Sequence, residues 1–240
     1  MSPHKGVSDA RRRRFYLLLL VLGLASLYAG TRFVSTKLTA PAHPLTGRRA
    51  AGIATDASWM DRAGREGEEA PDRALQLIDI RPSAIVADVG AGTGYITMRL
   101  ARLVGPGGKV YATDIQPGLL RILQRKAETE HLSNIEIVQG TETDVHVPDR
   151  TLDLALLVDV YHEFRQPREM LSSIRRALKI DGRLVIVEYR KEDPTIPIAD
   201  THRMSEADIR TEVQAERFTF DSTIEELPRQ HIVVFRKTSA

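Results

Sequence analysis

The sequence predicts a doubly wound α/β fold, in which a mostly parallel sheet carries helices on both faces. Between residues 71 and 189, short apolar runs typical of buried strands alternate with segments of helical periodicity. A glycine-rich turn follows the first run, and acidic residues follow four of the runs. Because the carboxyl ends of parallel strands meet at one edge of a sheet, these glycines and acids predict a ligand site there.

The first strand-like run, residues 84–89, passes through the glycine-rich turn into a helix that extends to about Val104. The turn has the pattern Asp88-x-Gly90-x-Gly92-x-Gly94. Glycines at such a turn let the backbone approach a ligand closely and leave the first N–H groups of the helix pointing at it. The dinucleotide fingerprint would need its last glycine where this chain has Tyr95, and no Gly-Lys-Ser/Thr phosphate loop is present. An ordinary glycine-rich turn without a ligand is the structural alternative.

This pattern resembles motif I of the class I methyltransferases that depend on S-adenosylmethionine (SAM). SAM carries an ammonium and a sulfonium but no phosphate, so an acidic residue beside the glycines suits it electrostatically. The resemblance covers about residues 60–238, and the segments VDVYHEF, EYR and HRMS are similar to those of bacterial methyltransferases near the ubiquinone-biosynthesis methylases. It implies a Rossmann-like sheet of seven strands, mostly parallel with an antiparallel final strand, and SAM as the cofactor.

Elements on either side of the first strand follow the same alternation. Pro71 suits the first position of a helix whose apolar residues continue to Ile78. Residues 109–114 predict a second strand, and residues 117–130 predict a helix. Asp114 stands at the tip of that strand, where a carboxylate accepts hydrogen bonds from both hydroxyls of a ribose. The alternative is that Asp114 caps the following helix; given the preceding motif, we favour ribose binding.

Residues 134–140 predict a third strand, and its end carries two acids, Glu142 and Asp144. In methyltransferases of this class an acid at this place commonly meets the adenine amino group. The resemblance therefore implies that Glu142 and Asp144 lie near the adenine, with a plain polar loop as the alternative. Together with the turn, the resemblance implies these cofactor contacts: Asp88, Gly90, Ala91, Gly92, Thr93, Gly94, Asp114, Ile115, Glu142, Asp144 and Asp159.

Residues 152–158 predict a fourth strand, and Asp159-Val160-Tyr161-His162-Glu163-Phe164 follow at its end. Helical spacing then runs from Met170 to Leu178, and Asp181-Gly182 is expected to close that helix before a fifth strand at 183–189.

The last third of the chain predicts one helix and a closing pair of strands. Ser205 is expected to cap the helix. Residues 218–220 and 231–235 are expected to form an antiparallel hairpin at one edge of the sheet. Here the chain departs from the wider methyltransferase pattern, because Glu216-Arg217-Phe218 stands where Ala-Gly-Phe is usual. That departure concerns the sheet edge rather than the cofactor site.

His162 is the best candidate for a general base, because it follows the fourth strand beside the expected methyl position and has a suitable pKa. His202 is the second candidate, since the segment after the fifth strand often covers the acceptor site in this class. The structural alternatives are a hydrogen bond within the loop for His162 and a helix start for His202. Further residues are expected to line the acceptor pocket: Tyr161, Glu163, Glu188 and Tyr189.

Trp59, the only tryptophan, and the basic Arg62 and Arg65 precede the first predicted helix. They form either a lid over the cofactor or a solvated capping helix. The chain has no cysteine, and its histidine, aspartate and glutamate residues show no compact ligand spacing. The sequence therefore predicts no metal site.

The N-terminal residues predict a membrane anchor. A basic segment, residues 1–14, precedes the uncharged residues 15–31, which would reach about 25 Å as a helix. The alternative is a cleaved signal peptide that exports the protein, and Arg12-Arg13-Arg14-Phe15 loosely resembles a twin-arginine signal. The flanking charges favour a cytoplasmic N-terminus only slightly, so the side of the membrane stays open. Residues 32–58 are expected to form a linker to a methyltransferase domain at 59–240.

Charge argues against nucleic acid as a partner. Residues 51–240 hold 25 Lys and Arg against 31 Asp and Glu, a net charge of −6, with no basic stripe. The sequence therefore predicts a SAM-dependent methyltransferase with an unidentified acceptor, a small molecule or a lipid-soluble metabolite being favoured. Two alternatives stay open: a membrane-tethered SAM-binding domain without catalysis, and a nicotinamide-dependent oxidoreductase. The sequence predicts no oligomeric state.

Overall fold

The computed structural model describes residues 41–53 and 56–238, which belong to one compact unit. Within these residues no helix has the length and apolar character needed to cross a bilayer. The predicted anchor at 15–31 and the basic segment at 1–14 lie outside the described residues.

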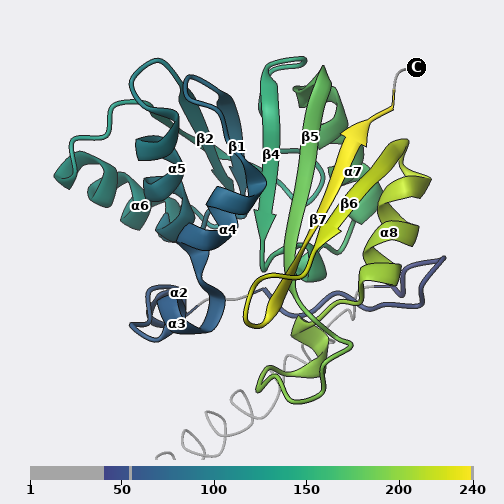
Figure 1. Ribbon diagram of the computed structural model, residues 1–240. Helices are drawn as coiled ribbons and strands as arrows, with labels where there is room; N and C mark the ends of the chain where they lie inside the picture. The colour runs from purple at the N-terminus through teal and green to yellow at the C-terminus, as the bar shows by residue number, and fades with distance from the viewer. Residues whose placement is uncertain (1–40, 54–55, 239–240) are drawn as a thin grey trace, which may run out of the picture. The chain divides into compact units, whose positions relative to one another are not determined.

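One seven-stranded sheet forms the centre of the described part, with the strand order β3-β2-β1-β4-β5-β7-β6 (Figure 1). Its strands are β1 (Ile85–Val89), β2 (Lys109–Asp114), β3 (Ile135–Gln139), β4 (Leu152–Val158), β5 (Leu178–Tyr189), β6 (Phe218–Ile224) and β7 (Gln230–Lys237). β1 to β5 pair in parallel, whereas β7 is antiparallel to both β5 and β6. This topology confirms the predicted fold class and the closing hairpin.

Helices cover both faces of the sheet, and successive strand residues alternate between the two cores. α4 (Pro71–Ile78) and α5 (Tyr95–Val104) pack on the face that carries Val86 and Leu156. α6 (Pro117–Thr129) packs beside α5 over Ala112. α7 (Pro167–Ala177) and α8 (Glu206–Ala215) pack on the opposite face with Ala87 and Leu157. A strand buried on both faces is the arrangement that the continuous apolar runs predict.

Short helices lie at the carboxyl edge of the parallel strands (Figure 1). They are α2 (Ala57–Met60), α3 (Arg65–Glu69), η1 (Tyr161–Glu163) and η2 (Asp200–His202). Local signals set several helix starts, as predicted. Pro71 occupies the first turn of α4, and the Ser205 side chain accepts a hydrogen bond from the Asp208 N–H at 3.0 Å at the start of α8.

The predicted end of α7 is wrong. The helix stops at Ala177, and Leu178 already has an extended backbone that pairs with Leu152 of β4. The register then jumps to the pair Leu154 and Arg183, so the residues between form an irregularity within β5. Asp181-Gly182 therefore belongs to this irregular stretch and does not close the helix. Helical periodicity runs past Ala177 because Leu178 is fully buried in the same core as the helix.

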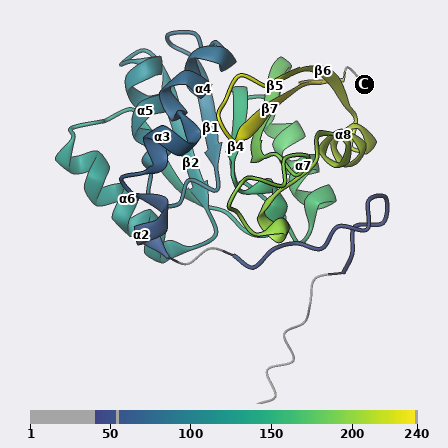
Figure 2. The ribbon, with the colours of Figure 1, turned by 60° about the horizontal axis from the view of Figure 1, so that its bottom comes forward.

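Residues 41–53, which the sequence assigns to the linker, pack along the carboxyl edge of the sheet (Figure 2). The Arg48 guanidinium donates to both carboxylate oxygens of Glu212 on α8, at 3.0 and 2.8 Å. The Ala51 N–H donates to the His162 carbonyl oxygen at 3.0 Å. This segment thus fastens α8 to the turn after β4 and brings residues 52–53 to the site described next.

Candidate active site

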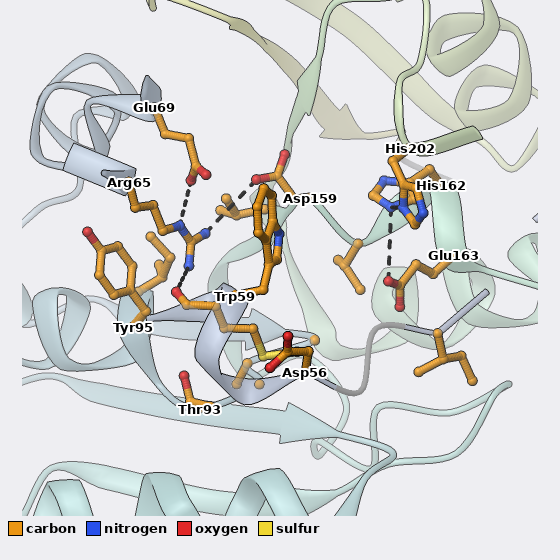
Figure 3. Close-up of a pocket in the computed structure, with 18 of the residues that line it drawn as sticks. Asp56, Trp59, Arg65, Glu69, Thr93, Tyr95, Asp159, His162, Glu163 and His202 are labelled. Carbon is orange, nitrogen blue, oxygen red and sulfur yellow. Dashed lines mark hydrogen bonds and ion pairs between the residues drawn. The ribbon is translucent and has the colours of Figure 1, made fainter. Parts of the chain in front are cut away.

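Two adjoining cavities open at the carboxyl edge of the parallel strands. The larger has a volume of about 600 Å³ and is lined by residues at the ends of β1 and β4, in α2 and α3, and in the segment 197–202. Figure 3 shows residues that line it. The smaller has a volume of about 70 Å³ and lies over the ends of β2 and β3. Both are lined in part by the same residues: Ile53, Gly90, Asp114, Gln116, Val160 and Glu163. The arrangement therefore suits one ligand that extends across both, with room beside it for a second molecule.

The glycine-rich turn forms the floor between the two cavities. Gly90 has a φ of +76°, and a Cβ there would lie 2.4 Å from Val160 Cγ2, so only glycine fits. The Gly92 N–H donates to Asp114 Oδ2 at 2.9 Å, which fixes the turn against the tip of β2. Ala91 and Thr93 line the larger cavity. Gly94 does not line either cavity, because it faces Leu123 of α6 and starts α5.

Three carboxylates line the larger cavity, one from the end of each of β1, β2 and β4, and those of Asp88 and Asp114 are buried. Burial raises the pKa of Asp88 to about 6, although Thr97 Oγ1 donates to it at 2.5 Å. Burial also raises the pKa of Asp114. The pKa of Asp159 lies well above its usual value because of burial and the nearby acid Glu69. A cationic ligand would relieve this cost by stabilising the charged forms, so the site favours a cation.

Arg65 brings a guanidinium to the same cavity (Figure 3). It donates to Glu69 Oε2 at 2.6 Å, lies 4.0 Å from Asp159 Oδ2, and stacks over the Tyr95 ring at 4.3 Å from the ring centre. Asp159 has a φ of +50° and receives both its 2.8 Å hydrogen bonds from Gln230 of β7. These contacts fix Asp159 and Arg65 as neighbours of opposite charge at the cavity wall.

Of the two readings of the Trp59 segment, the structure favours the lid. Trp59, Met60, Arg62 and Arg65 all line the larger cavity. Met60 lies over the glycine turn, since its sulfur is 2.9 Å from where a Cβ on Gly92 would be. Arg62 stacks on the Trp59 ring at 3.9 Å. Trp59 itself is 49% exposed, so the lid leaves its outer side in solvent.

Of the two acids that follow β3, only Glu142 lines the smaller cavity. Glu142 lines it together with Ile115, Phe164 and Met170. Asp144 lies outside both cavities, and its carboxylate accepts hydrogen bonds from the His146 N–H, the Ser173 hydroxyl and Arg176. Asp144 therefore bonds to its own loop and to α7 and does not face either cavity.

Two histidines, His162 and His202, face the larger cavity (Figure 3). They belong to a chain of hydrogen bonds that begins at Glu188. Buried Glu188 accepts from His162 Nδ1 at 2.8 Å and from the His162 backbone N–H at 3.1 Å. His162 Nε2 lies 3.1 Å from His202 Nδ1. Because a carboxylate only accepts, neutral His162 must carry its proton on Nδ1 and a lone pair on Nε2.

The two imidazoles have opposite pKa shifts. Burial by itself would lower the pKa of His162, but the carboxylate of Glu188 raises it overall. Burial and the neighbouring His162 lower the pKa of His202.

Two of the four residues predicted to line the acceptor pocket, Tyr161 and Glu188, do not line either cavity. Tyr161 does not line either cavity; it is fully buried and its hydroxyl donates to Glu212 at 3.0 Å. Glu188 lies behind His162 rather than at the cavity surface. Glu163 and Tyr189 do line the larger cavity. The sequence offers no local signal for residues 52–53 and 197–199, which reach the cavity only through the tertiary fold.

The comparisons with known proteins agree with this fold. Residues 87–186 match the family model Methyltransf_11, described as a methyltransferase domain. The chain is 32% identical over 120 residues to the ubiquinone/menaquinone biosynthesis C-methyltransferase UbiE of Hahella chejuensis, a match that covers 50% of this chain and 47% of that protein. The chain thus spans about half the length of the curated relatives it matches.

Solved structures share the architecture over most of the described part. A SAM-dependent methyltransferase from Aquifex aeolicus superposes with a TM-score of 0.71 at 24% identity, covering 76% of this chain and 98% of that one. The YcgJ protein from Bacillus subtilis superposes with a TM-score of 0.57 at 16% identity, covering 71% and 99%. At these identities the likeness shows the methyltransferase-type fold.

Proposed function

We propose that this protein transfers a methyl group from SAM to a small-molecule acceptor. The observation that carries the proposal is that Asp88, Asp114 and Asp159 lie beside a glycine turn in a cavity that two histidines also line. The match of residues 87–186 to the methyltransferase domain supports the same activity. The motif and the absence of a glycine at Tyr95 disfavour a nicotinamide cofactor.

The residues of the two cavities suit the parts of SAM. Asp114 borders both cavities, and each of its oxygens keeps a lone pair for a ribose hydroxyl beyond its bond to the backbone N–H of Gly92 or Gln116. The slot with Ile115 and Glu142 suits an adenine. The acids Asp88 and Asp159 suit the ammonium, and the guanidinium of Arg65 suits the carboxylate of the methionyl part.

The chain's own residues then have a limited chemical task. SAM, when bound, supplies a methyl group on a sulfonium that is already a strong electrophile. The cavity aligns the acceptor with that methyl and excludes water under the lid formed by α2 and α3. His162 faces the acceptor side with the lone pair of Nε2, held in place by Glu188. We propose that His162 accepts the acceptor's proton and that His202, which lies 3.1 Å from His162 Nε2, assists this proton transfer.

We propose the class of acceptor from the names of the curated relatives and from the N-terminal apolar segment. The curated relatives are named as C-methyltransferases of ubiquinone and menaquinone biosynthesis. A small, lipid-soluble acceptor fits those names and fits an N-terminal anchor. We propose that residues 15–31 hold the protein at a membrane as a single-pass anchor, with export after signal cleavage as the alternative.

Calorimetric titration of the full chain in detergent with SAM, S-adenosylhomocysteine and NAD tests the cofactor. Micromolar binding of both adenosyl ligands without binding of NAD supports the proposal, and binding of NAD alone contradicts it. Turnover separates catalysis from mere binding: S-adenosylhomocysteine should accumulate from SAM when a panel of quinol-type and phenolic acceptors is supplied. A protein that binds SAM but forms no S-adenosylhomocysteine with any acceptor would instead be a SAM-binding domain without catalysis.

A further inference from the structure

Three potential metal ligands meet at the acceptor end of the larger cavity. They are His162, Glu163 and His202, and one ligand atom from each lies within 4.8 Å of the other two. His162 and Glu163 come from the short helix after β4, whereas His202 comes from η2, about 40 residues later. From this geometry we infer that the three side chains bind one divalent transition-metal ion. The inference rests on the proposed function and departs from the sequence-based prediction that the chain holds no metal.

The distances suit a common ion. Two ligand atoms about 2.1 Å from a metal ion lie roughly 3.0–3.4 Å apart when the angle at the ion is 90–110°. The observed distance between His162 Nε2 and His202 Nδ1 is 3.1 Å. Glu163 Oε1 lies 4.0 Å from His162 Nε2, so the carboxylate must approach by roughly 1 Å. Two imidazoles and one carboxylate form the donor set of catalytic zinc and of non-haem iron(II) sites.

A second observation concerns the group behind His162. A metal-binding histidine usually donates its other ring N–H to a carboxylate, which fixes the tautomer and aims the lone pair at the metal. Glu188, which is fully buried, accepts that hydrogen bond from Nδ1 at 2.8 Å and also holds the His162 backbone N–H. His162 is therefore already in the tautomer that binds a metal.

The position of the cluster assigns the ion a task in methyl transfer. The three ligands line the larger cavity, so an ion there keeps coordination positions open toward the space beside the cofactor region. An acceptor oxygen that occupies such a position has its hydroxyl pKa lowered and its location fixed. The hydroxyl proton passes to water, the acceptor's electron pair forms the bond to the methyl carbon, and the carbon–sulfur electron pair stays on sulfur. The substrate class that follows is an acceptor with an acidic hydroxyl at or next to the methylated atom.

Metal titration of the full chain in detergent, stripped with a chelator beforehand, tests the inference without any turnover. Zn²⁺ affinity is measured by competition with a chromophoric chelator, and Co²⁺ is added separately to record its visible spectrum. We expect one ion per chain. Zn²⁺ affinity should fall about 100-fold in His202→Ala and at least tenfold in Glu163→Gln. His131→Asn is the matched control, because it removes an exposed histidine far along the sequence from the cluster and should leave affinity unchanged.

SAM titration of the same proteins keeps the two proposals apart. His202→Ala should bind SAM within about twofold of the parent chain, since His202 lines only the larger cavity and is not assigned to the cofactor. Absence of a stoichiometric ion in the parent chain overturns the inference, as does full metal affinity in both ligand variants. In either case unchanged SAM binding would leave the proposed methyl transfer standing, with His162 acting on the acceptor's proton directly. Loss of SAM binding in the parent chain would instead count against the proposed function.

Discussion

Replacing Asp114 by alanine is expected to weaken SAM binding by roughly ten- to 150-fold. The carboxylate lies at the tip of β2, buried between the two cavities. Its Oδ2 accepts from the Gly92 N–H at 2.9 Å and its Oδ1 from the Gln116 N–H at 2.8 Å. The same two oxygens are therefore fixed in place and directed to the site where the ribose is expected.

The magnitude follows from what alanine removes. A hydrogen bond to a charged group contributes about 1.5–3 kcal/mol, and every 1.36 kcal/mol is tenfold in affinity. The carboxylate is expected to bind two ribose hydroxyls, but the contributions of two neighbouring hydrogen bonds do not add. The expected loss of binding free energy is therefore that of one charged hydrogen bond. Alanine also frees the Gly92 N–H, which holds the glycine turn against β2. That loss adds to the effect rather than opposing it.

Calorimetry on the full chain measures the change, with Asp144→Ala as the matched control. Asp144 is also an aspartate in the loop after a strand, but it lies outside both cavities and bonds to its own loop and to α7. Its removal should leave SAM affinity within about twofold. An Asp114→Ala protein that is folded by circular dichroism and binds SAM as tightly as the parent would remove Asp114 from the cofactor site. Weaker SAM binding by Asp144→Ala would instead indicate that Asp144 contacts the adenine.

Other residues give tests of charge, stability and closure. The pKa of Asp88 is about 6 in the folded chain, above its usual value, so the unfolded chain loses this proton at lower pH than the folded chain does. The free energy of unfolding, measured by chemical denaturation, should therefore fall as pH rises from about 4 to 6, by at most about 3 kcal/mol. Asp88→Asn should remove this dependence on pH. Arg48→Ala should lower the free energy of unfolding by about 3 kcal/mol, because it removes the guanidinium that pairs with the buried Glu212; a loss below about 0.5 kcal/mol would refute the role of the 41–53 segment. Saturating SAM should shift the fluorescence of Trp59, the only tryptophan, and an unchanged spectrum would show that the lid does not contact the cofactor.

Much of the site was predictable because its signals are local. The glycines Gly90 and Gly92 and the acids at the ends of β1, β2 and β4 lie in or next to the strands that position them. Parallel strands bring their carboxyl ends to one edge, so the alternation of strands and helices was enough to gather Asp88, Asp114 and Asp159. Glu142 and Asp144 were not separable by sequence, because two residues in one loop differ only in which partners the fold offers them.

The sequence by itself determined the α/β class, the doubly wound sheet and the edge at which ligands bind, since hydrophobic periodicity and turn residues act over a few neighbours. Only the tertiary structure decided which side chains from distant elements meet. Helical spacing could not reveal that Leu178 starts a strand, because burial in a shared core looks alike in both elements. Nor could it reveal that Glu188, His162, Glu163 and His202 converge from β5, the turn after β4 and η2. Such contacts depend on how whole elements pack, and that packing is set by the complete core rather than by any local stretch.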